Sequence, residues 1–282
     1  MPAARAALAP EFRLFYDTLG DHGDWVLIEP YGYLFRPRVE YHTWRPYESG
    51  FWAPTDNFGW VWISSEPFGW ATYHYGRWFY DDFRGWVWQP GTQWGPAWVD
   101  WQANDRYVGW TPLGPGNTWR PVRADVPGGK YVYAAVEDMG TADLELLRPS
   151  QLGAAVSDAT TANNPAIVEG VEVPLGPSIQ RIERVTGKSL ARVKMADLLT
   201  PPQAEADAGR PEAAAGRSGS PERPVTIEDT RRAGEQAAKE ARTLKGRAGG
   251  LPQRLPIVRP VGRPIEPSRP AKPDSVPVKS GG

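Results

Sequence analysis

Residues 50–75 read GFWAPTDNFGWVWISSEPFGWATYHY, and residues 76–101 read GRWFYDDFRGWVWQPGTQWGPAWVDW. At an offset of 26 residues the two stretches are identical at nine positions, six of which are Gly or Trp. Repetition at a period of 20–50 residues is typical of one supersecondary unit that is stacked on its neighbours. The duplication therefore predicts a fold built from repeats of this unit. The identical positions are Gly50/Gly76, Trp52/Trp78, Asp56/Asp82, Gly59/Gly85, Trp60/Trp86, Val61/Val87, Trp62/Trp88, Gly69/Gly95 and Ala71/Ala97.

A weaker copy of the unit comes before this pair. At an offset of 27 residues, residues 23–35 align with residues 50–62, and Gly, Trp or another aromatic residue stands at the matching positions. A fragment, YVGW, follows at residues 107–110. All 14 Trp of the chain lie in residues 25–119, so the repeats and the tryptophans occupy the same region.

Each unit is predicted to form a β-hairpin with one further strand. The runs WVWI at residues 60–63 and WVW at residues 86–88 are rich in strand formers, and polar turn residues precede both. Gly59 and Gly85, just before these runs, can adopt a positive φ at little steric cost. Side chains alternate along a strand, so one face is aromatic in all three copies and is predicted to form the core. The residues of this face are Tyr33/Phe35, Trp60/Trp62 and Trp86/Trp88.

The fold class predicted from these repeats is mainly β. Residues 20–119 are expected to form an antiparallel β-meander, either closed into a small barrel or strongly curled. Residues 1–19 form an N-terminal segment, in which residues 11–19 have apolar side chains at helical spacing. Residues 1–10, MPAARAALAP, lack the apolar stretch of a signal peptide. Two interpretations of them stay open: a remnant of a small-residue cleavage site, or an unstructured start of the chain.

Residues 120–200 are predicted to form a small α+β segment, because the aromatic residues end at Tyr133 and shorter periodic stretches follow. The segment either packs on the aromatic domain or forms an independent unit. Ser178 suits the N-cap of a helix, and Gly187 suits its end. The expected elements are strands at residues 130–136, 167–173 and 189–195, a loop at 150–165, and a helix that carries Ile179, Ile182 and Val185 on one side.

Residues 201–282 are predicted to be a disordered tail. They contain 13 Pro and no aromatic residue, and such a composition cannot bury enough apolar surface to offset the entropy lost on ordering. Residues 226–245 are Ala-rich and can form a helix, but its apolar face is too thin for a core, so we expect no tertiary packing of the tail. From residue 242 onward nine basic and two acidic residues leave a net charge of +7. This basic run is either a solvated tether or a contact for an anionic surface, such as cell-wall polymer, lipid headgroups or nucleic acid.

The composition excludes several kinds of site. The chain has 282 residues, a net charge of −1 and no Cys, so disulfides and thiolate metal sites are excluded. It has no run of about 18 apolar residues, the length of a transmembrane helix. No phosphate-binding loop, dinucleotide fingerprint, nucleophile elbow or zinc-protease motif occurs, and His22, His42 and His74 lack the spacing of a metal site. Asp81-Asp82 is interpreted as a turn, because adjacent strand residues point to opposite faces. We predict no enzymatic activity, no cofactor and no metal.

The aromatic domain contains no Lys, since the first Lys of the chain is Lys130. Arg stacks on aromatic rings and pairs with carboxylates better than Lys does. We therefore expect the arginines of this domain to lie across Trp and Tyr rings, mainly as surface cover. These residues are Arg36, Arg38, Arg45, Arg77, Arg84 and Arg106.

The stretch from Trp70 to Tyr80 holds the predicted binding surface. If it is one continuous strand, both of its faces are aromatic, and only one of them can face the core. An exposed cluster of aromatic side chains marks an interaction site. We predict that Tyr73, Tyr75 and Arg77 form a contact surface for a ligand or partner, with His74 and Trp78 turned inward. The alternative is that residues 120–200 cover this face.

Five stretches of the chain resemble a family of Trp- and Gly-rich bacterial envelope proteins, catalogued only as a domain of unknown function. The resemblance is close over residues 14–120 and looser over residues 130–200. It implies an all-β aromatic domain, a Pro-rich tail and export to the periplasm or cell envelope, and it implies no activity. Members typically carry a signal peptide, which is not recognisable in this chain. The stretches are GYLFRPRV, RPYESGFW, GWVWISSEPFGWATYHYGRW, GWVWQPGTQWGPAWVDW and YVGWTPLGPG.

Three classes of function stay open. The first is a non-catalytic envelope module whose exposed aromatic residues bind a cell-wall polysaccharide or an envelope protein, because rigid aromatic platforms suit either partner. The second is a purely structural scaffold that uses the tail as a tether. The third is a hydrolase whose Asp, Glu or His residues leave no sequence signature. We favour the first class.

Overall fold

The computed structural model describes residues 3–41, 43–116, 121–123, 125–168, 170–194, 199–200, 227–244 and 257–258. The strands are β1 Gly23–Ile28, β2 Gly32–Pro37, β3 Gly50–Pro54, β4 Trp60–Ser64, β5 Arg77–Asp81, β6 Gly85–Gln89, β7 Val99–Ala103, β8 Tyr107–Pro112, β9 Val132–Ala135, β10 Thr160–Thr161, β11 Pro165–Val168, β12 Val171–Pro174, β13 Leu199–Thr200 and β14 Ile257–Val258. The α-helices are α1 Ala3–Ala7, α2 Arg13–Leu19, α3 Gly69–Thr72, α4 Pro149–Leu152, α5 Ile179–Thr186 and α7 Ile227–Leu244. Short 3₁₀ helices are Pro10–Phe12, Val136–Asp138 and Gly153–Val156.

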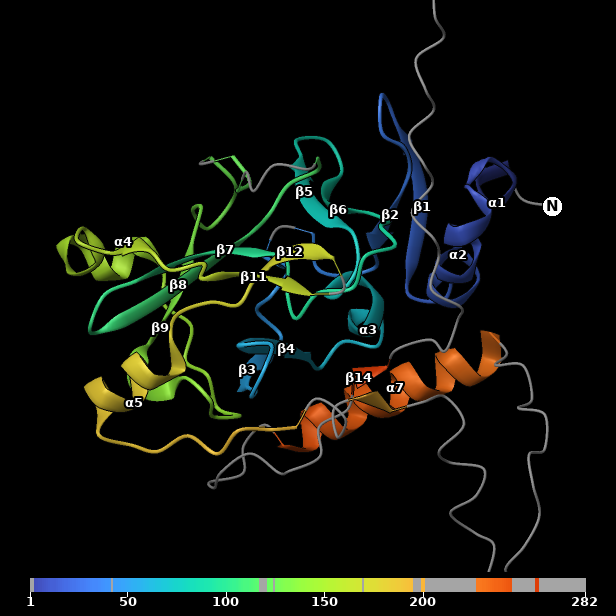
Figure 1. Cartoon of the computed structure of the whole chain (residues 1–282). Helices are drawn as coiled ribbons and strands as arrows, with labels where there is room; N and C mark the ends of the chain where they lie inside the picture. The colour runs from blue at the N-terminus through green and yellow to red at the C-terminus, as the bar shows by residue number, and fades with distance from the viewer. Residues whose placement is uncertain are drawn as a thin grey trace, which may run out of the picture.

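The strands form mainly antiparallel sheets, which confirms the predicted fold class (Figure 1). Two sheets have four strands each, in the orders β1-β2-β6-β5 and β10-β7-β8-β9. The pairs β3-β4 and β11-β12 are separate hairpins, and β13-β14 is a short parallel pair. Within the described residues the sheets stay open and form no barrel, so of the two predicted forms the closed one is not adopted.

Each copy of the sequence repeat forms a β-hairpin, and the hairpins share the same strand register. Trp52 lies opposite Trp62 in the β3-β4 hairpin, and Trp78 lies opposite Trp88 in the β5-β6 hairpin. The weaker first copy places Trp25 opposite Phe35 in the same way. Antiparallel partners on one face lie close enough for their rings to interact, so each hairpin carries one aromatic cross-strand pair at the same place. The predicted equivalence of the copies is confirmed.

The fragment at residues 107–110 belongs to a fourth hairpin, which also carries an aromatic cross-strand pair. In the β7-β8 hairpin Trp101 lies opposite Trp110, and the connection between the two is one residue shorter than in the other three hairpins. The sequence indicated only a fragment of the unit here, because the shorter connection shifts Trp110 out of step with the 26-residue repeat. In the hairpin, Trp110 takes the place of Trp62 and Trp88.

The turns of the first three hairpins share a glycine with a positive φ. The φ angles are 80° at Gly32, 59° at Gly59 and 74° at Gly85, a region that is costly for residues with a Cβ. Polar side chains also hold the turns: the Asp81 carboxylate accepts hydrogen bonds from the backbone N–H groups of Phe83 and Arg84, at 3.0 and 2.8 Å. The predicted turn at Asp81-Asp82 is thus confirmed.

The core is made of the aromatic side chains of these hairpins. The Trp52 ring lies 4.8 Å from the Trp62 ring, 4.3 Å from Trp101 and 5.5 Å from Trp110, measured between centroids. Of the predicted core face, only Tyr33 stays partly exposed. The opposite face is buried as well, since Leu34 and Val87 form a second small cluster with Ile28. The uniform aromatic face is therefore core, as predicted, but it is not the only core face.

The order of the strands is not that of a simple meander. A single pair, Phe35 opposite Trp88, joins β2 to β6, so the first and third hairpins share a sheet while the second stands apart. Backbone N–H groups of β4 instead donate hydrogen bonds to carbonyl groups of irregular segments. Its Trp60 N–H donates to the Leu175 carbonyl at 2.9 Å, and its Trp62 N–H donates to the Pro96 carbonyl at 3.1 Å.

Residues beyond 120 pack on the aromatic hairpins, which decides between the two predicted arrangements. β9 pairs with β8, and β10 pairs with β7. Gly176 lies so close to the Trp60 and Trp101 rings that a Cβ there would come within about 3 Å of both. The Trp60 indole donates to the Pro177 carbonyl at 2.8 Å, so this segment closes one side of the core.

The elements predicted between residues 120 and 200 are found in part. The strand at 130–136 is β9, the strand pair around Gly170 is β11-β12, and the helix after Ser178 is α5, whose Ser178 hydroxyl accepts from the Arg181 N–H. Val185, however, is exposed. The predicted loop at 150–165 contains α4, a 3₁₀ turn and β10. The predicted strand at 189–195 is wrong over the described residues 189–194, where Val193 only bridges to Thr55.

The helix predicted at residues 226–245 is α7. Figure 1 shows it along the lower edge of the molecule, beneath β3, β4 and α3, and it contacts α2 as well. The expectation that the tail has no tertiary packing is therefore wrong for α7. The sequence pattern missed this contact because the face of α7 consists of small side chains rather than large apolar ones. The rest of the predicted tail, apart from residues 257–258, lies outside the described residues.

Two phenylalanines test the depth of the core. Phe51 is 1% exposed and Phe83, at the tip of the β5-β6 turn, is 88% exposed. We expect Phe51→Ala to lower the free energy of unfolding by about 3–5 kcal/mol, because a buried aromatic ring is lost. Phe83→Ala should change it by less than about 0.5 kcal/mol. Urea unfolding followed by circular dichroism measures both, and similar losses in the two variants would contradict this description of the core.

Candidate functional site

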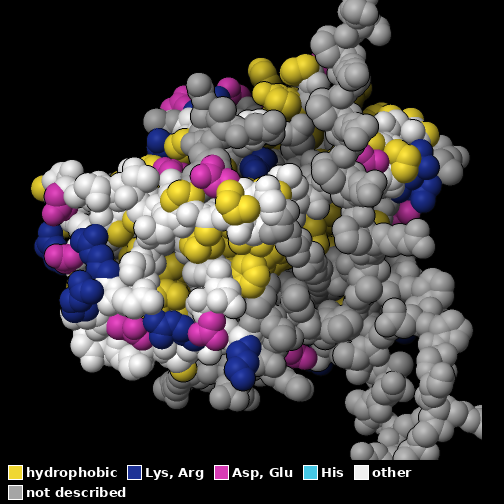
Figure 2. Space-filling view, in the orientation of Figure 1, with side chains coloured by type: hydrophobic (Ala, Val, Ile, Leu, Met, Phe, Trp, Pro, Cys, Tyr) yellow, Lys and Arg dark blue, Asp and Glu magenta, His cyan; other side chains and the backbone are white. Residues whose placement is uncertain are grey.

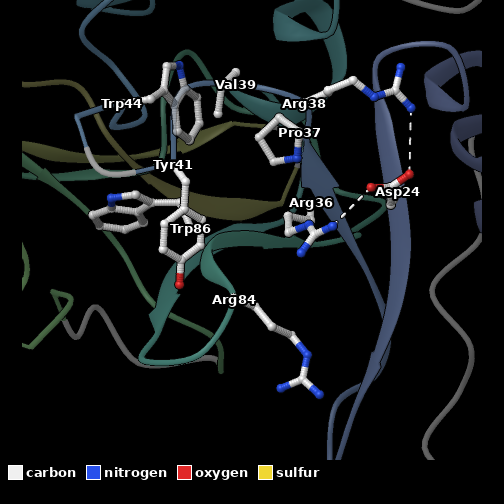
Figure 3. A pocket seen from close by; sticks show the side chains of 9 residues that line it. All are labelled: Asp24, Arg36, Pro37, Arg38, Val39, Tyr41, Trp44, Arg84 and Trp86. Carbon is white, nitrogen blue, oxygen red and sulfur yellow. Dashed lines mark hydrogen bonds and ion pairs between the residues drawn. The ribbon is translucent and has the colours of Figure 1, made fainter.

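A surface cleft of about 260 Å³ lies where the end of β2, the segment that follows it and the start of β6 meet. In Figure 3 the rings of Tyr41, Trp44 and Trp86 gather on one side, and Arg36 and Arg38 both reach Asp24 on the other. We call this the arginine cleft. Its lining residues are Asp24, Arg36, Pro37, Arg38, Val39, Tyr41, Trp44, Arg84 and Trp86.

The sheet places the residues of the cleft. Asp24 of β1 lies directly opposite Arg36 of β2, and the Phe35–Trp88 pairing brings β6 alongside. Tyr41 reaches this place because position 85 is a glycine. A Cβ on Gly85 would lie 2.7 Å from the Tyr41 ring, and its φ of 74° also favours glycine. The hairpin turn and the position of the Tyr41 ring therefore depend on the same residue.

The aromatic wall combines an accessible ring with anchored ones. Tyr41 is 37% exposed, whereas Trp86 is buried. Beneath Trp86 lies the buried guanidinium of Arg45, 5.6 Å from the ring centroid. Burial lowers the pKa of Arg45 to about 10, and Glu48 opposes this effect from 3.7 Å, so the group stays charged at neutral pH.

The charged wall carries more positive than negative groups. Arg36 lies 3.0 Å and Arg38 3.6 Å from the Asp24 carboxylate. Arg84, which Figure 3 shows directed away from the rings, lies 3.5 Å from Asp81. The three arginine side chains are between 38% and 64% exposed, so their ion pairs are solvated and weak. Such groups can exchange a protein carboxylate for one on a ligand.

Trp44, the third aromatic residue of the cleft, is held by a hydrogen bond to Glu66. The Trp44 indole N–H donates to Glu66 Oε1 at 2.5 Å, and the Tyr73 hydroxyl donates to Oε2. Burial raises the pKa of Glu66 to about 7, although the hydrogen bonds from Tyr73, Trp44 and Ser64 and the charge of Arg242 act in the opposite direction. The carboxyl group therefore titrates near neutral pH.

The structure does not bring the predicted contact residues to the surface. Tyr73 and Tyr75 are buried, and the Arg77 guanidinium lies 3.6 Å from the centroid of the Trp98 ring, where burial lowers its pKa to about 10. The prediction was wrong because the stretch is not one strand. Residues 69–72 form α3, and only residues 77–81 form β5.

Tyr73 and Tyr75 are covered by segments other than the predicted ones. The Tyr73 ring lies 4.6 Å from Tyr47, and the Tyr75 ring lies 5.5 Å from Phe15 of α2. Residues 120–200, the predicted alternative cover, do not provide these contacts. The inward orientation of His74 and Trp78 is confirmed. Burial lowers the pKa of His74 to about 4, and its Nδ1 lies 3.0 Å from the Gly95 carbonyl oxygen.

The predicted stacking of arginine on aromatic rings holds for half of the set. Arg45, Arg77 and Arg106 lie over Trp86, Trp98 and Tyr107. The other three arginines, Arg36, Arg38 and Arg84, pair with carboxylates and line the cleft. Sequence reasoning missed Tyr41 and Trp44, which lie in the stretch RVEYHTWRPYESG between two repeats. An aromatic and charged stretch without strand periodicity was the signal that could have marked a functional loop.

The described residues contain no group of three or more His, Asp or Glu side chains placed to hold a metal ion. The surface in Figure 2 shows positive and negative side chains interspersed around α4 and α5, rather than one field of a single sign. Among the described helices, none combines the length and the apolar character that a membrane crossing requires.

Residues 16–117 match the model of DUF6600, a family of unknown function. The match covers the four aromatic hairpins and includes the whole arginine cleft, and it confirms the resemblance to a domain of unknown function. No curated protein and no solved structure matches the chain.

The raised pKa of Glu66 predicts a specific pH dependence of stability. Its pKa is about 7 in the folded protein against 4.5 in the unfolded chain, so its contribution is complete below about pH 4.5 and is lost as the pH rises through 7. Glu66→Gln keeps the acceptor for Trp44 and cannot titrate, and we expect it to flatten the stability curve over this window. The measurement is the free energy of unfolding from urea titrations at pH 4–8.

The control for this measurement is Glu11→Gln, which alters an exposed glutamate. It should leave the slope between pH 4.5 and 7 unchanged. If wild type and Glu66→Gln show the same slope in that window, Glu66 does not hold its proton as described.

Proposed function

We propose that this chain is a non-catalytic module of the bacterial cell envelope that binds an acidic polysaccharide through the arginine cleft. The observation that carries the proposal is the exposed Tyr41 ring beside three solvent-accessible arginines in one cleft. Envelope location rests on the resemblance of the repeats to envelope proteins. The ligand class rests on the chemistry of the cleft.

The cleft offers two complementary kinds of contact to a sugar. A tyrosine ring provides a large, rigid surface for the apolar face of a pyranose at low entropic cost. Arginine can bind a carboxylate through two parallel hydrogen bonds. A sugar that stacks on Tyr41 would hold its carboxylate or sulfate group within the reach of Arg36 or Arg38, which lie across the cleft (Figure 3).

The size and charge of the cleft favour one residue of a longer acidic chain. Its volume of about 260 Å³ is below the roughly 300–1,000 Å³ of pockets that enclose drug-sized ligands. The lining has three arginines and one aspartate, so it attracts anions. A polymer can lie across such an open site and gain affinity from several weak contacts along its length.

A structural scaffold is the second candidate, and one observation favours it. The twelve largest fully buried side chains are all aromatic and include eight Trp, so most of the aromatic residues of the repeats serve packing. Of the predicted binding residues, Tyr73 is one of these twelve, and Tyr75 is buried as well. The scaffold needs no ligand at the arginine cleft, and the two functions therefore predict different results for the same variants.

The test compares two exposed tyrosines. Tyr41 lines the cleft, whereas Tyr31, 43% exposed, lies at the β1-β2 turn, where its ring is 4.9 Å from that of Phe79. With polygalacturonate as the acidic probe, we expect Tyr41→Ala to weaken binding by about tenfold, or about 1.4 kcal/mol, because the ring on which the sugar stacks is lost. Tyr31→Ala should bind like wild type. Isothermal titration calorimetry gives the affinities.

Substitution of a cleft arginine distinguishes ionic recognition of the ligand from non-specific binding. Arg36→Gln should weaken binding of polygalacturonate and leave binding of neutral dextran, if any, unchanged. Binding of the acidic probe should also fall as salt is added, because the exposed charges are screened. If neither probe nor purified peptidoglycan binds, or if Tyr41→Ala binds like wild type, the scaffold function is supported instead.

A further inference from the structure

The C-terminal helix α7 rests on the loop between β4 and α3, which also supports the arginine cleft. Its packed face is made of Thr230, Gly234, Ala237 and Ala238, which are spaced at three or four residues and are buried. A Cβ on Gly234 would lie 2.5 Å from Cδ1 of Trp70 and 3.3 Å from the Pro67 carbonyl oxygen. The helix therefore sits directly on the residues that border Glu66.

Two polar contacts fix the ends of α7. Near its start, Arg231 lies 2.5 Å from Asp21, just after α2. Near its end, the Arg242 Nε donates to the Ser65 carbonyl at 2.8 Å. Ser65 and Glu66 are adjacent in the β4–α3 loop, and the Glu66 carboxylate accepts the Trp44 indole N–H from the other side. The loop is thus held between α7 and a wall of the cleft.

The contact of α7 is weak for a helix of its length. Small side chains bury little apolar area, and a glycine in a helix interior costs about 1 kcal/mol relative to alanine. Both end contacts are partly exposed, and exposed ion pairs contribute little. α7 also contacts α2, α3, β4 and β14, but no strand pairing of the described residues includes it, so the helix can leave the loop while the sheets stay paired. Segments held in this way open with a lower free energy than the whole domain.

We propose that reversible docking of α7 regulates the arginine cleft. When α7 is docked, it fixes the β4–α3 loop, so that Glu66 holds Trp44 in the cleft wall. When α7 is undocked, the loop and Trp44 are released. The part about polysaccharide affinity rests on the proposed function. The movement of α7 and its effect on Trp44 do not. Glu66 is a positioning residue in this proposal, since it acts on the cleft only through Trp44.

The first experiment measures whether α7 opens by itself. The chain has no cysteine, so a single introduced thiol reacts alone. We compare the rates of reaction with Ellman's reagent for Ala238→Cys on the packed face, Lys239→Cys on the exposed face and Ala71→Cys in the core. We expect Ala238→Cys to react about tenfold or more faster than Ala71→Cys, and more slowly than Lys239→Cys. Equal protection of Ala238→Cys and Ala71→Cys would overturn the proposal.

The second experiment displaces α7 and observes Trp44. Gly234→Leu adds a side chain against Trp70, and it also raises helix propensity, so it disturbs docking and not the helix itself. The NMR signal of the Trp44 indole N–H, assigned by its loss in Trp44→Phe, reports the hydrogen bond to Glu66. We expect its hydrogen exchange to become about tenfold faster in Gly234→Leu. The matched control Lys239→Leu, on the exposed face of α7, should leave it unchanged.

Two outcomes decide whether the docking of α7 is coupled to the arginine cleft. If Ala238→Cys becomes as reactive as Lys239→Cys in the Gly234→Leu background while the Trp44 signal keeps its exchange rate, α7 does not act on the cleft. Arg242→Met removes both the contact to Ser65 and the positive charge that acts on Glu66, and it must show the same direction of change should Gly234→Leu fold poorly. Where polygalacturonate binds wild type, Gly234→Leu should also weaken that binding by threefold or more, and an unchanged affinity would contradict the regulatory role alone.

Discussion

The contact between the Trp52 and Trp101 rings, 4.3 Å between centroids, joins hairpins that share no strand pairing. The β3-β4 hairpin has no hydrogen-bonded strand beside it in the described part of the chain, and an isolated hairpin is only marginally stable in water. Its position is therefore set by side-chain packing, together with the backbone hydrogen bonds that Trp60 and Trp62 donate to irregular segments. Since Trp110 and Trp62 pack on the same ring, the second and fourth hairpins form one aromatic layer, and the sheet that carries the arginine cleft is assembled around it.

The hairpins were predictable from sequence because their determinants are local. A glycine with positive φ and two aromatic residues ten positions apart recur in the first three hairpins, and together they set the register. The order of strands was not predictable, since the single Phe35–Trp88 pair that joins the first hairpin to the third depends on contacts far apart in sequence. The α3 turn was missed for a similar reason: alternating aromatic residues suit a strand, but the backbone at residues 69–72 folds into a helix that buries Tyr73.

The arginine cleft could not be predicted from any single segment of the sequence. Its residues come from β1, from the end of β2 and the stretch after it, and from the start of β6, and none of these segments alone resembles a binding site. The sequence correctly indicated that arginine and aromatic residues work together in this domain. It did not indicate which arginines would be buried against rings, as Arg45 is, and which would stay at the surface with carboxylates, as Arg36 is, because that depends on how the sheets pack.

The shorter turn of the fourth hairpin has a consequence for how such a chain can change in length. Side chains alternate between the two faces of a strand, so adding one residue inside a strand would turn every later ring of that strand away from its partner. Between Trp101 and Trp110 the missing residue falls in the connection, and the cross-strand pair survives. Insertions and deletions in an array of this kind are thus confined to turns and linkers, or to whole hairpins, which enter or leave the array as complete modules.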